Sequence, residues 1–495
     1  MRLRVRCSIF ILRVFLQKTE KYRRYYMKGW TVLICVLICV GCAASVERFD
    51  VTKEIVAPEI EDYYPKEVRT AAPTRPLDIN EAVDIALRNS PLLKAAYSDV
   101  SAADDGLLKA VSNYLPKIDV SAIYHRRDNR MGTVMVFDPG DFGLPGSPIE
   151  LKQYMGERET QMFKAELKVP IYTFGLNEAL YRQAQHNLLS TSYSALYVKQ
   201  TVIRNVKRAY SQLVRAKKLR EIALRRLDMA KKHKTQVESL FKQGLVVKAD
   251  VLALDVAVAQ AETALLWEEQ NLKIATMGLA SAMGVSLDSN LDVTGVPPIE
   301  KVDEDVVTLV NRALRMNPQL RQMHHTILSL QEALNAVKSQ RYPMLFASGS
   351  YNWSSDDTQI HKDYWSTDIM LSWNAFSGLS ITADERSLKH QIEGLKQRQV
   401  SAVEGLKLAV RSALLAYNSA KKSYEVFKRQ FETASERFHV VETQFLAGAA
   451  TATDLVDAET ELFVSEANIT VAQTDIYNAL VELELAVSVP LSKEK

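Results

Sequence analysis

The sequence reads Ala86-Leu87-Arg88-Asn89-Ser90-Pro91-Leu92-Leu93 early on and Ala313-Leu314-Arg315-Met316-Asn317-Pro318-Gln319-Leu320 later, a shift of 227 residues. Further along the chain the shift becomes 204 residues, taking Gly244 to Gly448 and Asp250 to Asp454. A shift that stays constant over long stretches indicates internal duplication, so we expect two tandem structural repeats. Because 227 exceeds 204 by 23, the first repeat holds 23 extra residues between Tyr124 and about Phe163.

Each repeat has the same predicted order of elements. A helical stretch, residues 79–113 or 305–341, precedes Pro116 or Pro343, where a helix cannot easily continue. A pair of strands follows, and then a long segment without proline, residues 171–296 or 344–489. A heptad-like seam marks the first of these segments: Leu189, Leu196, Ile203 and Tyr210, with Val206 and Leu213 between them. A continuous helix over residues 177–241 would be roughly 95 Å long.

Each long helix is predicted to break once, at residues 243–250 and 447–454. Glycine supplies the left-handed end of one helix, at Gly244 or Gly448. Thr453 or Asp454 can cap the helix that follows. The chain then returns as helices of about 35 residues. The fold class is therefore mainly α with a small β part, built from long antiparallel helices.

The strand pairs alternate apolar and polar residues. Phe163-Lys164-Ala165-Glu166-Leu167-Lys168-Val169 alternates without error, and residues 118–124, 345–353 and 365–373 follow the same period. Lipid on one face and water on the other produces this pattern in a transmembrane barrel. The alternative is four amphipathic strands on a soluble core. Four strands cannot close a barrel in lipid, so several protomers would have to share one. Residues 126–159 are predicted to form an exposed loop, with residues 356–362 as its shorter counterpart.

Charge and cysteine content exclude several classes of protein. The net charge of the 495 residues is +3, but residues 1–26 alone carry eight Lys or Arg and one Glu, so the remainder is mildly acidic. This balance argues against a nucleic-acid partner. All four cysteines lie within the first 42 residues, which excludes a disulfide framework or a thiolate metal site in the rest of the chain.

The N-terminal region resembles a bacterial lipoprotein signal. Met27-Lys28-Gly29-Trp30 precedes about ten apolar residues, a length typical of signal peptides. The segment ends in Ile38-Cys39-Val40-Gly41-Cys42, which is similar to a lipobox and predicts lipidation of Cys42. The alternative is ordinary cleavage near residues 43–45 with loss of Cys42. We interpret residues 1–26 as an extension upstream of a start at Met27.

The predicted organisation has five parts. Residues 1–41 contain the upstream extension and signal peptide, and residues 42–76 form an irregular leader. The first repeat spans residues 77–287, a linker follows at residues 288–303, and the second repeat spans residues 304–491.

Together these features resemble the TolC-type outer-membrane efflux protein family. One marker is Asn80-Glu81-Ala82 with Pro91, which is repeated in part at residues 313–318. Two more, Tyr114-Leu115-Pro116 and Tyr342-Pro343, precede the first strand of each pair. The last, Val169-Pro170-Ile171-Tyr172-Thr173-Phe174-Gly175, follows the second strand of the first pair. The resemblance implies a homotrimer in which four strands per protomer build one twelve-stranded transmembrane barrel in outer-membrane lipid. It also implies an α-helical periplasmic tube that docks on a periplasmic adaptor and an inner-membrane pump.

The resemblance further implies a periplasmic gate. Asp454 and Asp457 match two acidic residues that ring the pore, where they would favour cations. Asp250 matches an aspartate that helps to hold the mouth shut. The Tyr, Arg and Thr of that lock are replaced here by Phe445, Ala450 and Ala249, which puts the polar lock in doubt. Asp454 also has an alternative role as a helix cap.

Adaptor contacts are expected at the two helix turns: Gly244, Leu245 and Val246 in the first, and Gly448, Ala449 and Ala450 in the second. The implied function is a passive outer-membrane channel subunit of a tripartite efflux or type I secretion system. The alternative is a periplasmic coiled-coil adaptor or scaffold without a pore. We find no nucleophile elbow, phosphate loop or zinc motif, so we expect no enzyme activity, cofactor or metal.

Overall fold

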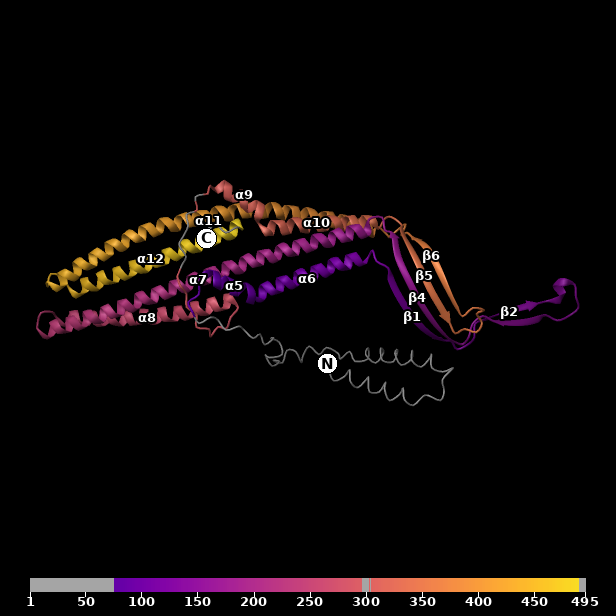
Figure 1. The fold of residues 1–495 in the computed structure, drawn as a ribbon, viewed down its shortest axis with the longest axis horizontal. Coiled ribbons are helices and arrows are strands. Elements are labelled where there is room, and N and C mark those ends of the chain that lie inside the picture. The colour runs from indigo at the N-terminus through magenta and orange to yellow at the C-terminus, as the bar shows by residue number, and fades with distance from the viewer. Residues whose placement is uncertain (1–74, 296–301, 303, 489–495) are drawn as a thin grey trace, which may run out of the picture. The chain divides into compact units, whose positions relative to one another are not determined.

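The computed structural model describes residues 75–295, 302 and 304–488, all of which belong to one compact unit, Arg69–Lys495. The predicted lipidation site at Cys42 and most of the leader lie outside these residues. Long antiparallel helices and a four-stranded sheet make up the unit, and the sheet lies at one end of the helices (Figure 1). This arrangement confirms the predicted fold class.

The two repeats contain helices of matching length. The first repeat has α5 (Ile79–Asn89), α6 (Pro91–Ser112), α7 (Leu176–Lys242) and α8 (Lys248–Met283), and the second has α9 (Val306–Met316), α10 (Pro318–Ser339), α11 (Ser380–Leu446) and α12 (Ala452–Val487). Both α7 and α11 have 67 residues, and both α8 and α12 have 36. At 1.5 Å per residue, each longer helix is roughly 100 Å long. Duplication of the sequence is therefore matched by duplication of the structure.

The stretches predicted as single helices, residues 79–113 and 305–341, are each divided in two. Pro91 and Pro318 occupy the first position of the second helix, where the missing N–H has no helical partner to lose. Ser90 Oγ accepts a hydrogen bond from the Leu93 amide (3.4 Å), and Asn317 Oδ1 accepts one from the Leu320 amide (3.1 Å). These caps redirect the chain at the duplicated Ser-Pro and Asn-Pro steps.

The sheet has the order β1-β4-β5-β6, and every neighbouring pair is antiparallel. Its strands are β1 (Lys117–Arg126), β4 (Glu159–Tyr172), β5 (Met344–Ser354) and β6 (Asp363–Ser372). The pairing of β4 with β5 joins the first repeat to the second. Strands β1 and β6 are left at the two edges.

The segment predicted as an exposed loop, residues 126–159, contains regular structure. Strands β2 (Gly132–Phe137) and β3 (Ile149–Tyr154) pair in an antiparallel hairpin, with a short 3₁₀ helix (Pro139–Phe142) between them. Strands of six residues flanked by glycine and proline give a weak local signal, which is why the sequence suggested a loop. Most of the hairpin is nevertheless exposed, as expected.

The heptad-like seam of α7 is buried only in part. Val206, Tyr210 and Leu213 lie in the main apolar core with residues of α5 and α8, and the Tyr210 hydroxyl donates a hydrogen bond to the Leu77 carbonyl (2.9 Å). Leu189 and Leu196, nearer the sheet, are 37% and 42% exposed. The chain by itself therefore covers the middle of the seam and leaves the part nearer the sheet exposed.

Candidate functional site

The four-stranded sheet has one apolar and one polar face, because its register keeps like residues opposite one another. On one face Leu167 is opposite Ile118 and Gly349, and Tyr351 is opposite Trp365. The other face carries Lys164, Glu166 and Lys168 of β4, opposite serine and asparagine residues of β5. The alternation predicted for each strand thus extends across the whole sheet.

The apolar face of the sheet is exposed in the chain by itself. Ile118 is 72% exposed, and Trp365 and Ile369 are 77% and 78% exposed. Exposed apolar surface of this extent marks a site of contact with lipid or with other chains. None of the helices in the described residues has the length and hydrophobicity of a transmembrane span.

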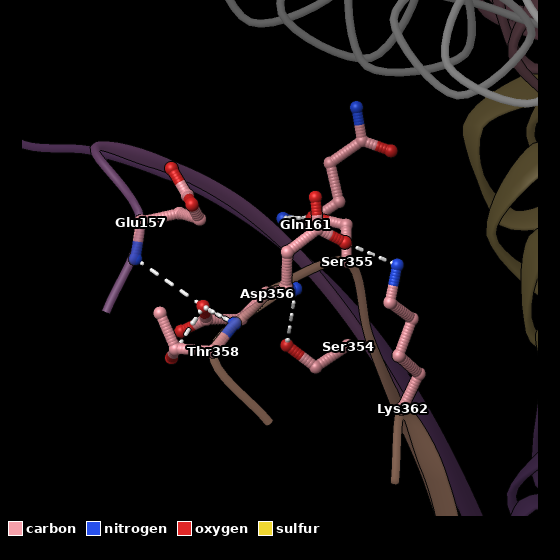
Figure 2. Close-up of polar contacts among 8 residues, drawn as sticks. Glu157, Gln161, Ser354, Ser355, Asp356, Thr358 and Lys362 are labelled. Carbon is pink, nitrogen blue, oxygen red and sulfur yellow. Dashed lines mark hydrogen bonds and ion pairs between the residues drawn. The ribbon is translucent and has the colours of Figure 1, made fainter. Parts of the chain in front are cut away.

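At the far end of the sheet, one buried carboxylate ties two loops together (Figure 2). Asp356, in the β5–β6 loop, is 8% exposed, and its Oδ1 accepts hydrogen bonds from the Glu157 amide (3.3 Å) and from the Thr358 amide and hydroxyl (3.0 and 2.8 Å). Beside it, Ser355 Oγ accepts a hydrogen bond from the Gln161 amide (2.8 Å). These contacts fix the base of the β2–β3 hairpin, a role that the sequence did not suggest.

The charged form of Asp356 is the stable one in this network. Burial raises the pKa of Asp356, but the hydrogen bonds from Thr358 and from the Glu157 amide together bring it below its usual value. The sheet end of the molecule is therefore held by an ionised acceptor.

The opposite end of the helices is formed by two turns of the same geometry. Gly244 and Gly448 have φ angles of 74° and 72°, a left-handed conformation that only glycine adopts readily. The Leu245 amide donates to the Leu240 carbonyl (3.0 Å), and the Ala449 amide donates to the Gln444 carbonyl (2.8 Å). Both turns close their helix with a Schellman-type pattern. The residues predicted to contact an adaptor all lie in these two turns.

Two of the three predicted gate aspartates cap the helices that leave these turns. Asp454 Oδ2 accepts hydrogen bonds from the Thr451 amide (2.9 Å) and hydroxyl (2.7 Å), and the Asp454 amide donates to Thr451 Oγ1 (3.2 Å). Asp250 Oδ2 accepts a hydrogen bond from the Val247 amide (3.1 Å). The N-cap of α12 is Thr451, and not Thr453 or Asp454 as expected. Asp454 is the third residue of the helix and completes the cap from there, as Asp250 does 204 residues earlier.

The hydrogen bonds from the Thr451 hydroxyl and amide lower the pKa of Asp454 below its usual value. A lowered carboxyl pKa means that the cap is present at neutral pH and is lost as the pH falls through that pKa. Asp457 lies one turn further along α12 and takes no part in the cap. Both carboxylates are exposed, and their spacing of three residues places them on the same side of the helix.

Apolar packing occupies the place where the resemblance implied a polar lock. Phe445 is 5% exposed and lies in one cluster with Val237 of α7, Leu254 of α8 and Leu455 of α12. Ala450 packs against the same cluster, whereas Ala249 is exposed. The two helical hairpins, α7–α8 and α11–α12, are thus joined near their turns by hydrophobic contacts that the sequence did not reveal.

Histidines from two helices meet nearer the sheet. His325 of α10 stacks against His186 of α7, with their Nδ1 atoms 3.4 Å apart, and against Tyr193. Burial and the neighbouring imidazoles lower the pKa of His325. Within residues 75–295, 302 and 304–488, no group of three or more His, Cys, Asp or Glu side chains could hold a metal ion.

The buried position of Phe445 predicts a large effect of its truncation. We expect Phe445→Ala to destabilise the packing of the two hairpins by about 3–5 kcal/mol, because it leaves a cavity in the apolar cluster. Leu446→Ala is the matched control, since Leu446 is 60% exposed and its loss should change stability by less than about 0.5 kcal/mol. Thermal unfolding followed by circular dichroism and protease cleavage at the turns measure the difference. Equal effects of the two variants would show that the cluster does not join the hairpins.

Comparison with known proteins agrees with this geometry. The outer membrane efflux protein family matches residues 82–285 and 309–488, which covers most of both repeats. Protein CyaE of Bordetella pertussis is 22% identical over 346 residues, 68% of each chain. The fold is similar to VceC of Vibrio cholerae (TM-score 0.69, 14% identity, 84% of this chain and 97% of VceC) and to the CmeC channel of Campylobacter jejuni (TM-score 0.69, 15% identity, 84% and 87%). The chain therefore belongs to the outer membrane efflux protein family, and it is an outer-membrane channel subunit for efflux or secretion and not a coiled-coil adaptor or scaffold.

Proposed function

We propose that three copies of the chain form one passive duct, which carries substrates from a periplasmic adaptor and an inner-membrane pump to the cell exterior. Each copy would contribute four strands to a shared twelve-stranded barrel, and the helices would form a tube through the periplasm. The family and the fold are those of channels without enzymatic activity. In this proposal the protein moves its cargo without chemical change and binds no nucleic acid or cofactor.

The two-faced sheet is the observation that carries the proposal. Strands β1 and β6 are edges, and unpaired edge groups cannot be left in lipid. Pairing β6 of one copy with β1 of the next would satisfy them and continue the apolar face around a closed wall. The part of the α7 seam nearer the sheet, at Leu189 and Leu196, is exposed, which supports a second contact between copies.

The proposed orientation follows from the two ends of the unit. The β2–β3 hairpin and the Asp356 network would lie outside the cell, and the turns at Gly244 and Gly448 would lie at the periplasmic end. Leu245 and Val247 are 68% and 64% exposed there, and they offer apolar side chains to an adaptor. We propose that the adaptor docks on these turns.

Three copies would also bring Asp454 and Asp457 together around one axis. Six carboxylates at a narrow opening attract small cations and disfavour anions. Asp250, in the other hairpin, would contribute a further carboxylate close to the mouth. The apolar cluster around Phe445 would hold the mouth shut in place of a polar lock.

We expect the double variant Asp454→Asn, Asp457→Asn to lose much of its cation preference and its block by multivalent cations in planar bilayers. Asparagine keeps the size of aspartate and removes its charge, and its amide oxygen at position 454 can still accept a hydrogen bond from Thr451. The stability of the trimer should change little, because both positions are exposed. The control Asp104→Asn, Asp105→Asn removes the same charge from exposed positions on α6. Unaltered ion selectivity of the Asp454 and Asp457 double variant would show that these aspartates do not line the constriction.

Neighbouring positions on β6 test which face of the sheet meets lipid. Ile369→Lys should reduce the amount of heat-stable trimer in the outer membrane, because a lysine facing the middle of the bilayer costs about 2–4 kcal/mol. Asp368→Lys, on the polar face, should assemble normally and shift conduction toward anions. Immunoblots of membrane fractions and bilayer recordings measure the two effects. Normal assembly of the Ile369 variant would contradict a lipid-facing position.

We also propose that the mature protein begins at Cys42 and carries acyl chains on its sulfur and its amine, in addition to the barrel that holds it in the outer membrane. Mass spectrometry of the N-terminal peptide should find the lipidated cysteine. Cys42→Ser should weaken localisation more than channel formation. An unmodified N-terminus at Ala43 or beyond would exclude the anchor.

A further inference from the structure

Two titratable side chains are buried where the helical hairpins meet, and neither is part of the proposed gate. Glu459 of α12 is 4% exposed and His233 of α7 is 6% exposed. Among the described residues, Glu459 Oε2 and His233 Nε2 have no hydrogen-bond partner. Buried polar atoms are nearly always paired, so two unpaired ones in one interface call for an explanation other than packing.

Both residues lie in the region of the Phe445 cluster. The His233 ring meets the edge of Phe438, a member of the cluster, with 6.4 Å between ring centroids. Glu459 follows Ala458, another member, along α12, and it interacts electrostatically with Glu442 of α11, which also acts on His233. Arg226 Nη2 donates a hydrogen bond to Thr460 Oγ1 (3.2 Å), which ties α7 to α12 at the same level. Separation of the hairpins would expose both titratable groups to water.

The charges around the two groups come from several helices. Arg226 of α7 favours ionised Glu459, and Glu442 of α11 opposes it while favouring a charged His233. On α8, Asp255 and Glu262 form ion pairs with Lys234 (2.7 Å) and Lys231 (3.2 Å) of α7.

Burial dominates both groups and acts on them in opposite directions. It raises the pKa of Glu459 to about 7, with Arg226 lowering and Glu442 raising it. It lowers the pKa of His233 from 6.5, with Glu442 opposing this shift. The packed hairpins therefore hold a protonated carboxyl and a neutral imidazole when the pH is slightly below neutral.

We propose that Glu459 and His233 are a compensating pair of proton-binding groups, in which each group cancels the pH dependence that the other alone would give to the packing of the two hairpins. Packing adds a proton to one group and removes a proton from the other, so little net proton exchange accompanies it. This behaviour would matter in a compartment exposed to the pH of the medium. Its importance for conduction depends on the proposed gate, but the pair itself does not.

The two groups contribute to the packing in opposite pH ranges. Glu459 has a raised pKa in the packed state, so its contribution is full below pH 4.5 and is lost as the pH rises toward 7. His233 has a lowered pKa, so its contribution is full above pH 6.5 and is lost as the pH falls through its packed-state pKa. Over the pH unit below 6.5 the two slopes oppose each other.

Single variants should reveal these opposed slopes in the full-length trimer in lipid. His233→Gln leaves Glu459 alone, so the equilibrium constant for packing should fall by up to about tenfold as the pH rises from 5.5 to 6.5. Glu459→Gln leaves His233 alone, so the constant should fall by up to about tenfold as the pH is lowered over the same range. The wild-type protein and the double variant should change by less than about threefold.

Spin labels are attached to the two turns at Leu245→Cys and Ala449→Cys. The distance between them, measured by pulsed electron paramagnetic resonance, reports the fraction of molecules in which the hairpins are packed. These cysteines are unique beyond residue 42, and dilution with unlabelled chain limits each trimer to one labelled protomer. Glu461→Gln and His439→Gln are the controls, since their side chains are 41% and 71% exposed, and both should behave like the wild type. Infrared spectra at pH 6 should show a protonated carboxyl band that Glu459→Gln removes.

Three results would overturn the proposal. The packing constants of the two single variants could change with pH in the same direction, or neither constant could change, or the carboxyl band could be absent. The label distances do not depend on conduction. Failure of the Asp454 and Asp457 selectivity experiment would therefore refute the gate and leave this inference intact.

Discussion

The antiparallel pairing of β4 with β5 is the contact on which the rest of the structure depends, because it joins the first repeat to the second. Helix α7 follows β4 and helix α10 precedes β5, so the pairing places these two helices side by side, and they pack against each other. It also aligns the apolar residues of both repeats on one face of a single sheet. Edges remain only at β1 and β6 of that sheet, and these are the edges that the proposed assembly of several copies would pair.

At the other end of the helices, a hydrophobic cluster joins the two hairpins near their turns. A polar lock requires a few atoms in fixed geometry, whereas the Phe445 cluster gains its stability from apolar area removed from water. Such contacts tolerate small shifts but lose their whole contribution when the surfaces separate. The exposed carboxylates of Asp454 and Asp457 lie outside the cluster, so in the proposed gate different residues of α12 would supply the charge and the closure.

Much of the candidate site could be predicted because it is local. The turns at Gly244 and Gly448 and the caps at Asp250 and Asp454 depend on a few consecutive residues, and the constant shift identifies each from the other. The burial of Phe445, Glu459 and His233 could not be predicted in the same way, because it depends on which hairpin faces which. The Asp356 network joins residues about 200 positions apart in the chain, so no local sequence pattern predicts it.

The sequence by itself determined the two repeats, the long helices and their breaks, and the alternating faces of the four strands. Each of these follows from periodicity or from the backbone preferences of proline and glycine, which act over a few residues. The breaks before Pro91 and Pro318 also follow from the backbone preference of proline, although residues 79–113 and 305–341 were each expected to form one continuous helix. Only the tertiary structure decided the order β1-β4-β5-β6, the β2–β3 hairpin and the apolar link at Phe445. These features depend on contacts between distant segments, where burial and pairing outweigh the preferences of any one stretch of chain.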